Sequence, residues 1–135
     1  MYMKVALLQL SPEGSPDANF QKAKKYVEEA GRNGADVALL PEIWNIGYVS
    51  GDEYPGGIDA WNAAAITTGD ERYREYASLA QENRIAIALP YLEREYDKLF
   101  DTVSLIDMNG KTALTYRKVQ TVRKSWEKVL SAGDT

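Results

Sequence analysis

Residues 37–42 read VALLPE, and this short stretch decides the fold class. Its first four residues are apolar, which predicts a buried strand that is closed by Pro41-Glu42. Residues 4–10, KVALLQL, have the same character and predict another buried strand. Between the two strands, apolar residues recur at helical spacing: Phe20, Ala23, Val27 and Ala30. A strand, a helix and a strand in this order predict a parallel pair with a right-handed crossover, which is an α/β fold.

The segment after Glu42 adds a long connection, a second helix and a third strand. Residues 43–68 contain four Gly and several aromatic residues. Such a long connection is typical of a functional loop or of a loop that carries short helices. Residues 70–83 return to helical spacing, and residues 85–89 (IAIAL) predict a third buried strand that Pro90 closes.

The last pattern along the chain is a hairpin. Residues 101–106 and 112–116 have strand-like patterns and flank Asn109-Gly110, which is a strong signal for a tight hairpin turn. The predicted strands are apolar on both faces, yet two βα units and a hairpin provide too few elements to cover them. The turn-like cluster at residues 129–135 is of the kind that leads into another element. We therefore expect residues 1–135 to form a single incomplete domain with a mixed sheet.

Composition narrows the chemistry that these residues can perform. The 135 residues include no Cys and no His, which excludes disulfides, thiolate zinc sites, thiol nucleophiles and a Ser-His-Asp arrangement within them. The net charge of -4, without a basic stripe, argues against a nucleic-acid partner. No apolar run approaches the length of a membrane span, and a strand-like pattern begins where a signal peptide would lie. We expect a cytoplasmic protein without a membrane partner.

Two charged residues continue the apolar faces of predicted strands. Alternation places Glu42 on the face of Ala38 and Leu40, at the carboxyl end of a strand, where ligand sites gather in open α/β sheets. A carboxylate that caps the next turn or pairs at the surface explains the same position. Lys118 continues the face of Tyr116, either drawn inward or extended to water. An inward Lys118 would need a carboxylate beside it, and Glu42 is a candidate.

Taken together, these segments resemble the start of the carbon–nitrogen hydrolase (nitrilase) superfamily. The resemblance spans essentially the whole chain, and its most specific element is Leu-Pro-Glu followed at this distance by Tyr-Arg-Lys. It rests on residues 4–10, 34–42, 47–48, 85–90, 101–107, 116–120, 127–128 and 133–134. Two positions depart from the family pattern, because Asp101 stands where Asn is common and Gln120 where His is frequent. These departures leave the closer subfamily open.

The resemblance implies the N-terminal half of an αββα four-layer sandwich and a Glu-Lys-Cys catalytic set, without a cofactor or a metal. By this resemblance Glu42 matches the general base, Lys118 matches the lysine beside the developing oxyanion, and Glu127 is similar to a second glutamate near the substrate. The nucleophilic Cys of the family lies beyond the Gly-Asp turn at residues 133–134, and these 135 residues do not contain it. We therefore expect the chain to be inactive alone.

The implied substrate is a small amide, carbamoyl amine or nitrile, and the implied assembly is a homo-oligomer of the complete protein. Trp44 and Tyr48 follow the Leu-Pro-Glu motif and are candidate substrate-binding residues, with core packing as the alternative for both. An alternative function is a non-catalytic binding or oligomerisation module that retains the fold elements. A carboxylate-metal hydrolase has no tight acidic motif to support it, because Glu93, Glu95 and Asp97 alternate in a loop-like stretch where solvated charge is expected.

Overall fold

One mixed five-stranded sheet forms the centre of the protein, in a computed structural model that describes residues 2–122 and 125–134. The strands lie in the order β1-β2-β3-β4-β5, with β1 to β3 parallel and β4 and β5 antiparallel to their neighbours. Their bounds are β1 (Val5–Leu7), β2 (Val37–Leu39), β3 (Ala86–Glu95), β4 (Lys98–Ile106) and β5 (Thr112–Arg117). The parallel strands and the final hairpin confirm the predicted α/β architecture.

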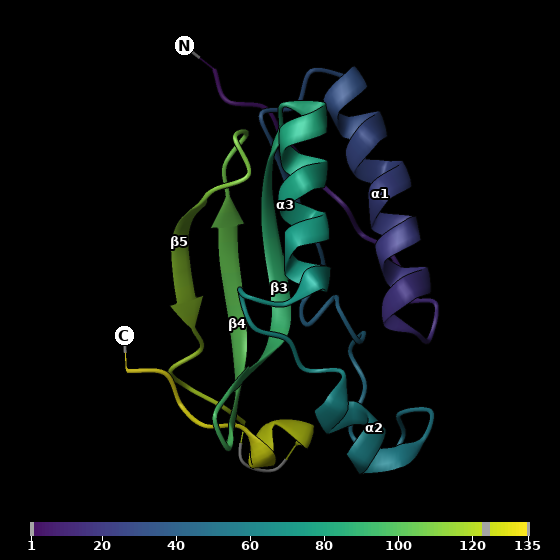
Figure 1. The fold of residues 1–135 in the computed structure, drawn as a ribbon, viewed down its shortest axis with the longest axis vertical. Coiled ribbons are helices and arrows are strands. Elements are labelled where there is room, and N and C mark those ends of the chain that lie inside the picture. The colour runs from purple at the N-terminus through teal and green to yellow at the C-terminus, as the bar shows by residue number, and fades with distance from the viewer. Residues whose placement is uncertain (1, 123–124, 135) are drawn as a thin grey trace.

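Two long helices cover one face of the sheet (Figure 1). Ser15 starts the first of them, since its Oγ accepts a hydrogen bond from the Ala18 N–H. The rings of Phe20 and Tyr76 then join the two helices edge to face, with their centroids 5.0 Å apart. A short helix lies in the long connection, as expected from its length. The helices are α1 (Pro16–Arg32), α2 (Gly57–Ala63), α3 (Glu71–Asn83) and the 3-10 helix η1 (Trp126–Val129).

The end of β3 differs from the sequence prediction, which closed this strand at Pro90. The strand continues to Glu95, and its partner β4 begins at Lys98 instead of Asp101. Pro90 is tolerated because its carbonyl faces away from β4 and accepts a hydrogen bond from the Trp44 N–H at 2.9 Å. The missing N–H of a proline in a strand lies on the same side as its carbonyl, so the β3–β4 ladder loses no hydrogen bond.

The other face of the sheet, called the open face below, is apolar and exposed. Ala6, Ala38 and Ile87 pack toward the helices, so the residues next to them along each strand point to the opposite side. The exposed apolar side chains on this side are Val5, Leu7, Leu39, Leu114 and Tyr116. Contiguous exposed apolar surface of this kind marks a contact site. Within the described residues, no helix combines the length and apolar character needed to cross a membrane.

Candidate active site

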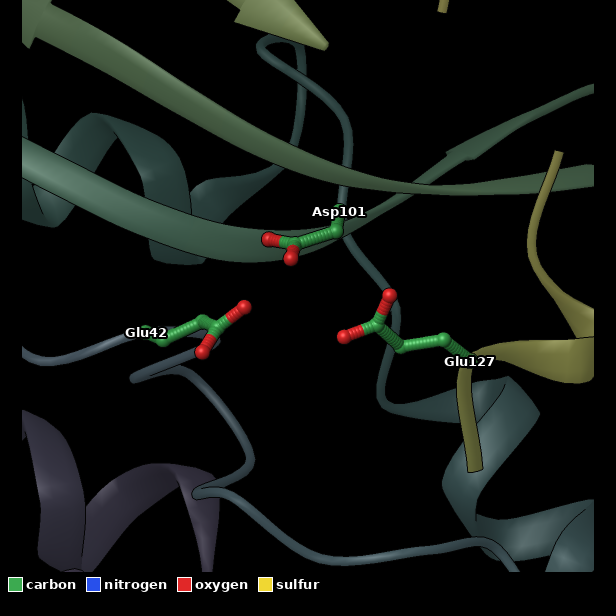
Figure 2. A group of neighbouring side chains, drawn as sticks. All are labelled: Glu42, Asp101 and Glu127. Carbon is green, nitrogen blue, oxygen red and sulfur yellow. The ribbon is translucent and has the colours of Figure 1, made fainter. Parts of the chain in front are cut away.

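Three carboxylates from separate parts of the chain meet at one end of the sheet. Glu42 follows β2, Asp101 lies in β4, and Glu127 lies in η1. Figure 2 shows the three side chains directed toward one another, and one carboxylate oxygen of each lies within 4.8 Å of the others. Carboxylates this close repel one another unless a cation or a proton compensates their charge.

Lys118 supplies the cation for this group. Its Nζ donates hydrogen bonds to Glu42 Oε1 and Glu127 Oε1, each at 2.9 Å, and lies 3.4 Å from Asp101 Oδ2. The backbone positions the lysine, since the Lys118 N–H donates to the Asp101 carbonyl at 2.8 Å just beyond the end of β5. The Lys118 side chain is therefore drawn inward, and Glu42 is one of its partners.

Glu127 is the most deeply buried of the three carboxylates, with 2% of the residue exposed. Its Oε2 accepts a hydrogen bond from the Val122 N–H at 2.8 Å, while its Oε1 receives Lys118. Ser125 begins η1 by accepting a hydrogen bond from the Glu127 N–H on its Oγ at 3.2 Å. Each carboxylate oxygen of Glu127 thus accepts a hydrogen bond, and a buried carboxylate needs such donors in place of water.

The charges of the group change how its members titrate. Burial raises the pKa of Glu42, but hydrogen bonds with Asp101 and Lys118 outweigh burial and hold that pKa below its usual value. Burial alone would lower the pKa of Lys118, but its hydrogen bonds to Glu42 and Glu127 outweigh burial and raise that pKa above its usual value, so the lysine stays protonated. Burial, followed by the neighbouring Glu42, raises the pKa of Asp101 to about 7. At neutral pH the group therefore combines an ionised Glu42 with a Lys118 ammonium.

A depression of about 370 Å³ opens beside these side chains, on the open face of the sheet. This volume lies within the range of small-molecule sites. The lining residues are Leu39, Leu40, Glu42, Pro90, Asp101, Val103, Tyr116 and Lys118. An apolar wall with a few converging charged groups can hold a small polar molecule against the carboxylate and the ammonium.

A family model described as carbon-nitrogen hydrolase matches residues 4–134. The chain belongs to the carbon-nitrogen hydrolase family. It is 32% identical over 126 residues to the aliphatic nitrilase of Rhodococcus rhodochrous, covering 87% of this chain and 33% of that relative. It is 34% identical over 118 residues to the chloroplastic omega-amidase of Arabidopsis thaliana, covering 85% of this chain and 31% of the relative.

Solved structures similar to this carbon-nitrogen hydrolase chain share its fold. The carbon-nitrogen hydrolase of Helicobacter pylori G27 superimposes with a TM-score of 0.81 at 20% identity, covering 98% of this chain and 45% of that one. A mutant of the amidase from Nesterenkonia sp. AN1, with acrylamide added at its active-site cysteine, gives 0.80 at 22% identity, with 99% and 51% covered. The chain thus spans about half of the length of these structures. Its fold is nitrilase-like and corresponds to the N-terminal half of an αββα sandwich.

The two aromatic residues expected near the substrate lie apart in the structure. Trp44 is 1% exposed, packs in the core beneath the helices, and does not line the depression beside Glu42. Tyr48 is 60% exposed and meets the Trp126 ring edge to face at 5.4 Å, next to Glu127 in the chain. Tyr48 is accessible at the surface but does not line the depression either, so its role in substrate binding stays a prediction.

Two features of the structure were not predicted from the sequence. Asp101 was noted only as a departure from the family pattern, although it is part of the carboxylate group. The charged run after Pro90 was interpreted as a solvated loop, which is wrong because Glu93 lies in β3 and is 7% exposed. Arg117 holds Glu93 through Nε and Nη2, both at 2.8 Å. The alternation of Glu93 and Glu95 was a strand signal, and the basic partner lies directly before Lys118.

Proposed function

We propose that the complete protein hydrolyses a non-peptide carbon–nitrogen bond of a small amide, carbamoyl amine or nitrile. The observation that carries this proposal is the Lys118 ammonium, which donates 2.9 Å hydrogen bonds to both Glu42 and Glu127 at the edge of the depression. The family membership supplies the reaction class. The substrate stays open, because the matched relatives include both a nitrilase and an omega-amidase.

In this proposal Glu42 is the general base. It is ionised at neutral pH, and its side chain is 39% exposed beside the depression, so it can accept a proton from a nucleophile or from water. The nucleophile is a cysteine thiol from outside the 135 residues, which contain none. Loss of a proton to Glu42 converts the thiol to the thiolate, which is the reactive form.

Lys118 stabilises the negative charge that develops on the substrate oxygen or nitrogen when the thiolate attacks. An ammonium that is already oriented contributes roughly 10²–10³-fold per donor to such a step. In this proposal Glu127 is the second glutamate of the site, and it fixes the ammonium from the buried side through the 2.9 Å hydrogen bond from Lys118 Nζ.

For an amide or carbamoyl amine, Glu42 passes the thiol proton to the leaving nitrogen, and ammonia or an amine leaves with formation of a thioester. For a nitrile, the thioimidate first adds water and then loses ammonia to give the same thioester. A water molecule that loses its proton to Glu42 then attacks the thioester, which releases the acid and returns the cysteine.

The test is an assay of hydrolysis by these 135 residues combined with the segment that supplies the cysteine. That segment is either joined to them in one polypeptide or added as a separate chain. We expect Glu42→Gln to lower kcat by about 10²–10⁴-fold, because the amide cannot take the proton. Ammonia release from a panel of small amides and nitriles measures the rate, and Glu29→Gln, an exposed change on α1, is the matched control.

Two results would contradict the proposal. One is a Glu42→Gln protein that keeps the activity of the Glu29→Gln control. The other is hydrolysis by the purified 135-residue chain alone that disappears on Glu42→Ala, since these residues contain no thiol nucleophile.

The exposed open face favours a second candidate, a non-catalytic module that binds or self-associates through its sheet. Leu7 is 69% exposed and Leu114 is 61% exposed. If the chain is such a module, we expect it to unfold cooperatively alone and to sediment as an oligomer that Leu114→Glu dissociates. A monomeric chain that binds ANS and unfolds without cooperativity would rule this module out and favour an incomplete hydrolase domain.

A further inference from the structure

Asp101 is the least well compensated member of the carboxylate group. Its side chain is 8% exposed, so water does little to stabilise its negative charge. Among the described residues, the one cation near its carboxylate is Lys118, whose Nζ lies 3.4 Å from Oδ2. That separation is longer than an ordinary charge-assisted hydrogen bond.

The other two carboxylates are better suited to carry a charge. Lys118 directs its short contacts, both 2.9 Å, to Glu42 and Glu127. Glu127 has a further donor in the Val122 N–H, and the Glu42 side chain is 39% exposed to water. One ammonium therefore serves three carboxylates that lie within 4.8 Å of one another, and the arrangement calls for a proton on one of them.

We propose that Asp101 is a positioning residue for Glu42: as a neutral carboxylic acid it donates its O–H to a Glu42 oxygen and holds that carboxylate against Lys118. The proton sits on Asp101 because this carboxyl is buried, contacts its cation at the longest distance and faces another carboxylate. Two carboxylates at such a separation bind one proton between them more readily than either would alone.

The titration of the group agrees with this placement. Burial first, then the hydrogen bond with Glu42 and its charge, raise the pKa of Asp101 from 3.8 to about 7, while Lys118 opposes the shift. The titratable side chains that face Asp101 among the described residues are Glu42 from the loop after β2, Lys118 from the end of β5 and Glu127 from η1. The Glu93–Arg117 ion pair contacts Thr102, which points to the other face of β4.

The consequence for catalysis rests on the proposed function. When Asp101 loses its proton, Glu42 loses a hydrogen-bond donor and gains a negative neighbour, which makes Glu42 a stronger base but a less well held one. We therefore expect the pH dependence of kcat/KM to contain an ionisation near pH 7 that Asp101→Asn removes, because asparagine donates an N–H to Glu42 at every pH.

The decisive experiment follows the aspartate carboxyl carbons by NMR in protein labelled at that carbon. We expect one resonance to titrate with a midpoint near pH 7 and to be missing in Asp101→Asn. Asp97→Asn, a change at an exposed turn residue, should leave that resonance in place. Glu42→Gln should lower its midpoint, since the charge facing Asp101 is removed. A midpoint for Asp101 below pH 5, or one that Glu42→Gln leaves unchanged, would overturn the proposal.

Thermal unfolding at several pH values gives a second measurement, which requires no catalysis. Between about pH 4 and pH 7 the folded protein holds a proton that the unfolded chain has released, so rising pH should destabilise the wild type relative to Asp101→Asn. A difference in Tm that is constant over this range would contradict the proposal. Because neither measurement depends on turnover, both remain informative if the hydrolase activity itself is not found.

Discussion

Replacing Lys118 with methionine is expected to lower kcat/KM of the complete hydrolase by about 10³-fold or more. Methionine keeps much of the length and apolar stem of the lysine but removes the charge. The substituted protein loses the donor to the developing oxyanion, and it also leaves Glu42 and Glu127 without the ammonium that both contact at 2.9 Å.

The same substitution should change how the site titrates. Without the ammonium, three carboxylates within 4.8 Å of one another repel, and the protein should bind additional protons near neutral pH. Glu42 would then be protonated over part of the pH range in which it must act as a base. The residual activity of Lys118→Met should therefore rise with pH more steeply than that of the wild type.

Two further variants test whether charge or geometry matters. Lys25→Met, an exposed change on α1, should keep full activity. Lys118→Arg keeps the charge but replaces a compact ammonium with a planar guanidinium, and we expect it to recover only a small part of the rate. A Lys118→Met protein that retains more than about a tenth of the wild-type kcat/KM would contradict the role proposed for this lysine.

Strand alternation anticipates only part of this site. Lys118 continues the face of Tyr116, and both line the depression on the open face. The alternation predicted for Glu42 is wrong, because Ala38 and Leu40 pack toward the helices whereas Glu42 lines the depression on the open face. β2 ends at Leu39, so the two-residue period no longer fixes the direction of Glu42.

The distance in sequence between Glu42 and Lys118 could not indicate contact by itself, since the contact depends on β4 lying between β3 and β5. Glu127 was reached through the family resemblance alone, because a four-residue 3-10 helix leaves almost no periodic signal.

The part of the fold that was missed has one physical cause. The sequence pattern predicts that Pro90 closes β3 and therefore that the charged residues after it lie in a loop. A proline closes a strand only where its N–H is needed, and at Pro90 the neighbouring β2 has already ended. Once β3 is extended to Glu95, Glu93 comes into register with Phe100, and Arg117 reaches it across the sheet.

This extension leads to the largest expected change in stability, which is the replacement of Arg117 with methionine. The Arg117 guanidinium donates two hydrogen bonds of 2.8 Å to Glu93, and its Cζ lies 4.2 Å from the centroid of the Phe100 ring. The Glu93 side chain is 10% exposed, and beyond Arg117 its carboxylate accepts a hydrogen bond from Thr102 Oγ1 at 2.7 Å. Without Arg117 the protein would bury an uncompensated carboxylate, which costs about 3–5 kcal/mol for a fully buried pair.

We expect Arg117→Met to lower the free energy of unfolding by about 2–3 kcal/mol, less than the fully buried case because the Arg117 side chain is 23% exposed. Urea denaturation measures this change. Glu95→Gln is the matched control, since Glu95 binds the same guanidinium from the exposed side and should matter little. If Arg117→Met lowers the free energy of unfolding no more than Glu95→Gln does, the Glu93–Arg117 pair contributes nothing beyond an exposed surface pair.

A double variant separates the lost contact from the buried charge. Glu93→Gln combined with Arg117→Met leaves no buried charge, so it should be more stable than Arg117→Met alone, as a double-mutant cycle would reveal. Arg117 directly precedes Lys118, whose N–H donates to the Asp101 carbonyl at 2.8 Å. Loosening the end of β5 should therefore speed hydrogen exchange at the Lys118 amide in Arg117→Met and not in Glu95→Gln. That result would link the ion pair on one face of the sheet to the position of the lysine on the other.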